Sequence, residues 1–147
     1  MLRSFSKWLM PICTLMILAI SASSCSKGGG DTPTPPTPPV EADLVVTTTP
    51  TVGSNQVPAA LGTGLPVTVT ISSTMPSGGV KIDVTAKLET GTSNFFTGGL
   101  AKSTTASNNF TVTGVPTGSQ ACVCSVTVTS LSKSTNIWTG TFRFASK

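Results

Sequence analysis

One pattern constrains the fold of this chain more than any other: apolar and polar residues alternate one by one along much of residues 44–145. Successive side chains of a β-strand point to opposite faces of a sheet, so this alternation predicts strands with one buried face. In the clearest run, Val80, Ile82 and Val84 fall on one face, with Lys81 and Asp83 on the other. Gly, Pro, Asn or Ser residues bracket each run, as is usual between strands.

The alternation predicts seven strands, and no segment of this region shows the period of a helix. The expected strands cover residues 44–49, 65–73, 80–90, 94–103, 109–115, 120–131 and 136–145. We expect the fourth to be weak or bulged, because Gly98 and Gly99 interrupt it. In the last strand, Trp138, Phe142 and Phe144 share one face, which predicts that they belong to the core.

Seven short strands in one domain are typical of an immunoglobulin-like or fibronectin-like sandwich, and we predict this all-β fold class for residues 40–147. The chain is similar to that group in architecture only. It has no Tyr to form a tyrosine corner, and Trp138 lies in the last expected strand. A small jelly roll or another β-barrel is the alternative.

Composition narrows the function classes. The chain has no His, which excludes catalysis by imidazole and His-ligated metal sites, and only 10% of its residues are charged. Residues 40–147 carry six basic and four acidic side chains, too slight and too dispersed an excess to indicate nucleic-acid binding. Because no nucleophile-elbow motif is present either, we expect a protein that is not an enzyme.

The first 24 residues have the layout of a secretory signal peptide. Arg3 and Lys7 precede an apolar run over residues 8–20, and small residues follow at 21–24. The run is shorter than the roughly 20 residues that cross a bilayer core, and Pro11 breaks it. The sequence therefore predicts a cleaved signal peptide over 1–24 and not a retained transmembrane helix.

The segment Ala22-Ser23-Ser24-Cys25 resembles the lipobox of bacterial lipoproteins, with Ala22 where an aliphatic residue is usual. The resemblance implies cleavage before Cys25 and a diacylglyceryl group on its thiol, with the new amine commonly acylated. The residues from Cys25 to Asp31 resemble the start of many Bacteroidota lipoproteins. This implies a lipid anchor in the outer membrane, on either face, and no cofactor beyond the covalent lipid.

Residues 25–39 form the expected tether between the anchor and the sandwich domain. Its Gly28–Gly30 hinge precedes a proline-dense segment that favours polyproline II, a semi-rigid conformation of about 3.1 Å per residue. We therefore expect three parts in the chain: a signal peptide over 1–24, a lipidated tether over 25–39 and the β-sandwich over 40–147.

Cys122 and Cys124 are the two cysteines of the expected sandwich. On a regular strand they point to the same side with Cα atoms about 6.6 Å apart, near the upper limit for a disulfide. Three roles stay open: two buried thiols, a strained local disulfide, or a redox or metal role. Two thiolates without further ligands do not close a tetrahedral zinc site, so no metal is expected.

Two further sets of residues were candidates for a site. Asp83 and Glu89 face the same way on one expected strand but lie roughly 20 Å apart, too far for a glycosidase pair, which needs about 5 to 9.5 Å. Phe95 and Phe96 are candidate ligand contacts, because flat rings stack on sugars. The competing interpretation places one ring in the core and its neighbour over an edge.

These features together predict a lipid-anchored envelope protein whose sandwich domain binds other envelope proteins, as an accessory subunit or an adhesion module, through its faces or sheet edges. The alternative is a carbohydrate-binding module of a surface glycan-capture system. Exposed, coplanar aromatic rings would favour that alternative, and buried rings would count against it.

Overall fold

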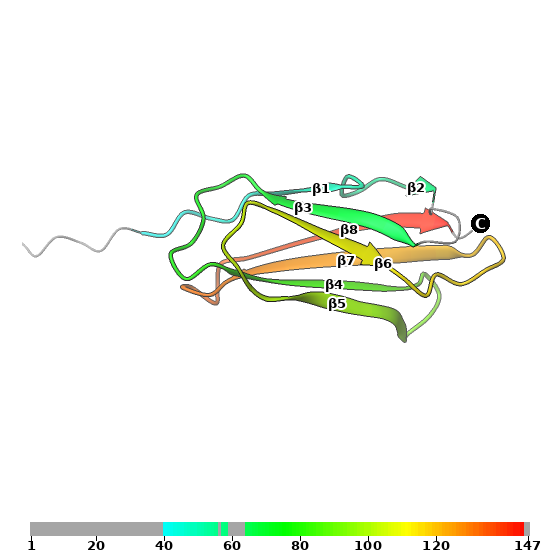
Figure 1. Ribbon diagram of the computed structural model, residues 1–147. Helices are drawn as coiled ribbons and strands as arrows, with labels where there is room; N and C mark the ends of the chain where they lie inside the picture. The colour runs from blue at the N-terminus through cyan, green and yellow to red at the C-terminus, as the bar shows by residue number, and fades with distance from the viewer. Residues whose placement is uncertain (1–39, 56, 59–63, 146–147) are drawn as a thin grey trace, which may run out of the picture. The chain divides into compact units, whose positions relative to one another are not determined.

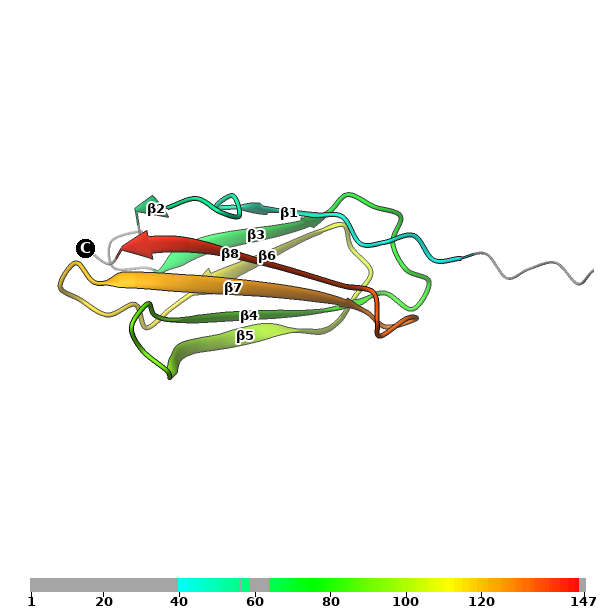
Figure 2. The ribbon, with the colours of Figure 1, turned by 180° about the vertical axis from the view of Figure 1, so that it is seen from behind.

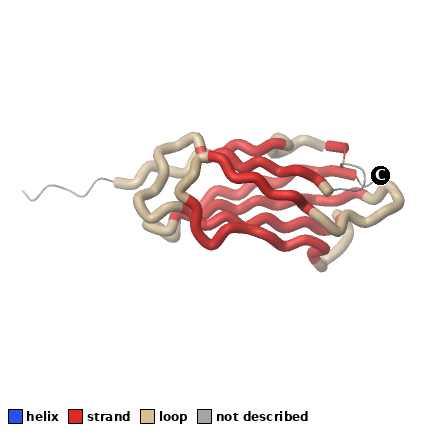
Figure 3. Tube along the Cα trace, viewed as in Figure 1, coloured by secondary structure: helices blue, strands red, loops and turns tan. Residues whose placement is uncertain are grey.

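The computed structural model describes residues 40–55, 57–58 and 64–145, all of which belong to one compact unit. The expected signal peptide, the tether and Cys25 lie outside the described residues. The part that the structure describes consists of strands and loops, with no helix (Figure 3). Accordingly, this part holds no helix that is long and apolar enough to cross a membrane.

Two sheets pack face to face (Figures 1 and 2). The smaller sheet has the order β1-β3-β6, formed by Val46–Thr49, Leu65–Ile71 and Ser107–Val112. The larger sheet has the order β2-β8-β7-β4-β5, formed by Val57–Pro58, Ile137–Ala145, Ala121–Ser130, Val80–Leu88 and Asn94–Ser103. All described pairs are antiparallel except β2 with β8.

The connections give this sandwich an immunoglobulin-like topology. The chain crosses between the sheets from β3 to β4, from β5 to β6 and from β6 to β7, whereas β4-β5 and β7-β8 are hairpins within the larger sheet. The N-terminal segment contributes β1 to one sheet and the two-residue β2 to the other. The predicted fold class is confirmed, with the seven longer strands at the expected places. The strand β2 was not predicted, because its two residues are too few to show an alternating pattern.

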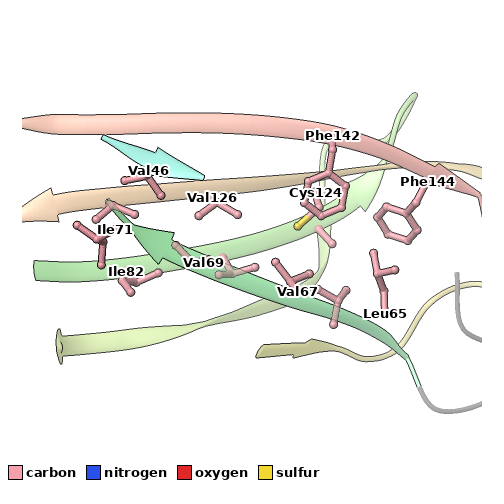
Figure 4. Packing of buried hydrophobic residues seen from close by; sticks show 14 of the residues in the cluster. Val46, Leu65, Val67, Val69, Ile71, Ile82, Cys124, Val126, Phe142 and Phe144 are labelled. Atoms are coloured by element: carbon pink, nitrogen blue, oxygen red, sulfur yellow. The ribbon is translucent and has the colours of Figure 1, made fainter. Parts of the chain in front are cut away.

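The core lies between the sheets and is built from the apolar side of each alternating run. Figure 4 shows side chains of both sheets meeting there, with the Phe144 ring beside Leu65. The ring centroids of Phe142 and Phe144 are 6.4 Å apart. The fully buried side chains include Val67 and Val69 from β3, Val80, Ile82 and Val84 from β4, and Val126 and Val128 from β7. The predicted inward faces of these strands are therefore confirmed.

The strand ends differ from the prediction by up to three residues, most informatively in β6. This strand begins at Ser107, two residues early, because Asn108 points inward with only 6% of its surface exposed. Its side-chain oxygen accepts hydrogen bonds from Ser103 Oγ at 2.7 Å and Thr105 Oγ1 at 3.1 Å. A polar inward residue breaks the apolar alternation, so the sequence pattern did not predict the first two residues of β6.

The expected irregularity of β5 is present, but not at its glycines. Gly98 and Gly99 pair in register with Val84 and Asp83, and the register shifts lie on either side, near both ends of the strand. A β-carbon at Gly99 would lie 2.2 Å from the carbonyl oxygen of Ile82. The glycines therefore permit a close approach of β5 to β4 instead of interrupting the strand.

Asn136, in the turn before β8, fastens the start of the domain to the β7-β8 hairpin. Its Oδ1 accepts from the Leu44 amide at 3.0 Å, and its Nδ2 donates to Glu41 Oε1 at 2.7 Å and to the Ala42 carbonyl at 2.9 Å. The described part of the chain begins beside this clamp, at one end of the sandwich (Figure 1). We call this end the tether end.

Candidate functional site

The larger sheet ends in a long strand, β5, whose outer side pairs with no other described strand. In Figures 1 and 2, β5 forms the lower margin of the sandwich, with no described segment beyond it. An unpaired edge presents a row of backbone N–H and C=O groups that can pair with another chain. The β5 edge is therefore the first surface to consider for binding.

The other edges of the described sheets are less suited to pairing. β2 has two residues and includes Pro58, β1 has four residues, and β6 has six. β5 has ten residues, and the five from Phe96 to Leu100 pair with β4 in unbroken register. Its one charged side chain is Lys102, near the tether end, so little charge protects the middle of this edge.

The middle of β5 has an apolar face and a polar face. Phe96, Gly98 and Leu100 pair with inward residues of β4 and so lie on the core side, whereas Thr97 and Gly99 lie on the outer side. The Phe96 ring covers Gly98, because a β-carbon there would lie 2.8 Å from Phe96 Cζ. Leu100 is 39% exposed.

The aromatic residues form no flat exposed platform among the described residues. Phe95, Phe96 and Trp138 are each half-buried and pack against the core cluster. A β-carbon at Gly140 would lie 2.4 Å from the Trp138 ring, so this ring lies flat along its own strand. This arrangement matches the interpretation in which the two Phe rings serve the core and the edge.

The outer face of the larger sheet is a surface of hydroxyl groups. One row of paired residues crosses four strands through Thr97, Thr85, Ser125 and Thr141. In the next row, Thr127 Oγ1 lies 3.5 Å from the Oγ1 of its partner Thr139. This face offers hydrogen-bonding groups in a regular order.

The acidic candidates are engaged in ion pairs or hydrogen bonds. Asp83 accepts from Lys81 at 2.9 Å, and Glu89 pairs with Arg143 across the sheet. Glu41 accepts from Asn136 in the clamp. The described residues contain no group of three or more His, Cys, Asp or Glu side chains that could hold a metal ion.

Cys122 and Cys124 lie on β7 as free thiols and are fully buried in the core. Figure 4 shows the Cys124 sulfur between the sheets, near Phe142. Burial raises the pKa of both thiols, that of Cys124 to about 12. Because the thiolate is the reactive form, these two thiols are poor nucleophiles and poor metal ligands at neutral pH.

A groove of about 490 Å³ opens at the tether end. The entering chain, the β3-β4 loop and the β7-β8 turn line it, with residues Val40, Glu41, Ala42, Thr74, Met75, Pro76, Ser77, Ser132 and Lys133. Its lining includes two charged residues, Glu41 and Lys133. This groove could not be predicted from the sequence, because its residues belong to segments without alternation.

Comparison with known proteins adds little to this description. No protein-family model matches the sequence, and no curated protein matches it. Among solved structures, the chain is similar to one described as the crystal structure of CopC from Methylosinus trichosporium OB3b. That likeness has 18% sequence identity and a TM-score of 0.46, and it covers 73% of this chain and 94% of that chain.

Proposed function

We propose that this protein is a lipid-anchored envelope protein whose sandwich domain acts without catalysis, as a module that binds other proteins. The observation that carries the proposal is the ten-residue β5 strand, which ends the larger sheet with an unpaired edge and almost no charge. Folded proteins usually shorten, charge or cover such an edge, because it invites pairing with another chain. An edge kept open on an otherwise well-packed domain is suited to strand addition by a partner.

The chemistry of the described residues agrees with a binding role. Asp83, Glu89 and Glu41 each have a partner within the fold, and burial holds the Cys124 thiol protonated at neutral pH. Catalytic groups need a free, tuned side chain in a polar cleft. These residues instead hold strands and the entering chain together.

The anchor is proposed on the sequence alone. Cys25 in its lipobox-like setting is the residue that would carry the lipid, and residues 26–39 would form the stalk. Two or three acyl chains, at about 0.8 kcal/mol per buried methylene, hold a small domain on a membrane almost permanently. The proposed location is the outer membrane, and the proposed partners are proteins of the same envelope.

The glycan-binding alternative predicts exposed stacking rings. Phe95 and Phe96 are half-buried against the core, so no observation favours this alternative over protein binding.

Cell fractionation tests the anchor, and chemical cross-linking tests the binding role. The chain should sediment with the outer membrane and resist a high-salt wash, and the Cys25→Ser variant should become soluble, because it has no acceptor for the lipid. Cross-linking in intact envelopes, followed by mass spectrometry, should then identify an envelope protein joined to the sandwich domain. Recovery of the wild-type chain in the soluble fraction would contradict the anchor.

If cross-linking yields no protein partner, retention on a glycan column that Phe95→Ala abolishes would contradict protein binding and favour glycan capture.

A further inference from the structure

We infer that the partner of the β5 edge is the same edge of a second copy of this chain. The five central residues of β5 are arranged symmetrically about Gly98, with Phe96 and Leu100 on the core side and Thr97 and Gly99 on the outer side. An interface between identical edges must be self-complementary, because a two-fold axis places each residue opposite its symmetry mate. In this stretch the two apolar side chains, Phe96 and Leu100, lie two residues on either side of Gly98, so each can meet the other across such an axis.

Antiparallel pairing centred on Gly98 would place apolar groups opposite each other. Phe96 would face Leu100 of the partner copy, Leu100 would face Phe96 of the partner copy, and the two Gly98 residues would meet at the axis. Cross-strand aromatic and aliphatic pairs of this kind lie about 5 Å apart and stabilise a sheet. The pairing would cover Leu100, which is one of the few exposed large apolar side chains of the described residues.

The middle of the edge carries no charge that would oppose this contact. Lys102 lies beyond the register shift near the tether end, and Asn94 ends the strand on the other side. In the register centred on Gly98, Lys102 would face Asn94 of the partner copy, so like charges are kept apart. The outer side is flat between Phe96 and Leu100, because Thr97 is the one residue there with a side chain and Gly99 has none.

This symmetry fixes the orientation of the two copies. β5 runs towards the tether end, because Ser103 pairs with Val80, whose neighbour Gly79 accepts from the Leu131 amide beside the clamp. Antiparallel β5 strands therefore place the two tether ends at opposite ends of the dimer. If each copy is anchored through Cys25, a step that rests on the proposed function, the dimer would join two facing membranes.

Five paired residues form a small interface, so we expect a weak dimer in solution. High surface density on two facing membranes would raise the effective concentration. Analytical ultracentrifugation from micromolar to millimolar concentration tests the dimer on a chain that lacks residues 1–24 and carries Cys25→Ser. This chain keeps every core residue and has no lipid. The absence of a dimer in this experiment would therefore contradict the dimer without contradicting the proposed anchor.

Leu100→Lys should raise the dissociation constant of the dimer at least about tenfold, because two copies of the charge enter the interface. Ile137→Lys is the matched control: Ile137 is 55% exposed, lies outside β5, and should leave the dissociation constant unchanged. Thr97→Lys, on the outer side of the edge, serves as a second test if Leu100→Lys does not fold. A monomer at every concentration, or a dimer that both β5 variants leave intact, would overturn the inference.

Spin labels test the orientation. Labels on Thr97→Cys should lie close together in the dimer, and labels on Ser134→Cys, in the exposed turn at the tether end, should lie much farther apart. The buried Cys122 and Cys124 should not compete for the label. Close approach of the Ser134 labels would contradict the antiparallel arrangement.

Discussion

Cys124 shows how the setting of one residue decides its chemistry. The residue faces the core from the middle of β7, paired with Ala86 on one side and Phe142 on the other. This apolar setting raises the pKa of the thiol to about 12 by desolvation of the thiolate. The spacing of Cys122 and Cys124 left three roles open, and the structure has two buried, unbonded thiols.

The raised pKa makes the folding stability depend on pH above about 9. In the unfolded chain the Cys124 thiol has its ordinary pKa of 9.0, whereas in the folded chain burial raises this pKa to about 12. The unfolded state therefore binds fewer protons than the folded state between pH 9 and 12. The contribution of the Cys124 thiol to stability is full below pH 9 and is lost as the pH rises from 9 to 12. Denaturant unfolding under reducing conditions should show this decline.

Cys124→Ala is the test of that decline. The variant should be less stable at pH 7 by about 0.5 to 3 kcal/mol, the usual range for a core truncation, but its stability should fall less steeply between pH 9 and 12. Parallel pH profiles for the wild type and the variant would show that the thiol does not contribute.

The pairing of β5 with β4 requires a glycine at position 99. Gly99 has no room for a side chain, since a β-carbon would meet the Ile82 carbonyl oxygen at 2.2 Å and the Asp83 Cα at 3.2 Å. Both obstacles are backbone atoms, so β4 and β5 would have to separate to admit a methyl group. Crowding of this kind costs about 1 to 3 kcal/mol.

Gly99→Ala should therefore lower the free energy of unfolding by about 1 to 3 kcal/mol in urea denaturation. Thr97→Ala is the matched control on the same strand. Its exposed side chain on the outer side should change stability by less than about 0.5 kcal/mol. Equal stability of the two variants would mean that β5 moves away from β4 without cost.

Sequence alone predicted elements best where burial alternates without interruption. β4 begins at Val80 as expected, because its inward residues are all apolar and its outward residues are all polar. The predicted start of β6 was two residues late, because Asn108 is buried with its side chain hydrogen-bonded, and a hydrophobic pattern does not reveal such a residue. The pair Gly98-Gly99 was read as an interruption, because a sequence does not distinguish a glycine that breaks a strand from one that lets two backbones approach.

The whole molecule adds what no single strand can show, which is the order of the strands. The sequence predicted a weak or bulged strand here but not an edge strand, and only the order β2-β8-β7-β4-β5 makes β5 a free edge. The candidate site therefore follows from topology, which depends on long-range pairing. The same holds for the Asn136 clamp, whose partners lie 92 or more residues away in the chain.

The central claim is that the β5 edge of an anchored domain binds protein. A photo-crosslinking amino acid at Thr97, in the lipidated chain within its own envelope, tests it most directly. The same amino acid at Thr111, exposed on the edge strand β6 of the other sheet, is the control. We predict a protein adduct from position 97 and none from position 111, with the adduct at twice the mass of the chain if the partner is a second copy. No adduct from position 97, or equal adducts from both positions, would contradict the account.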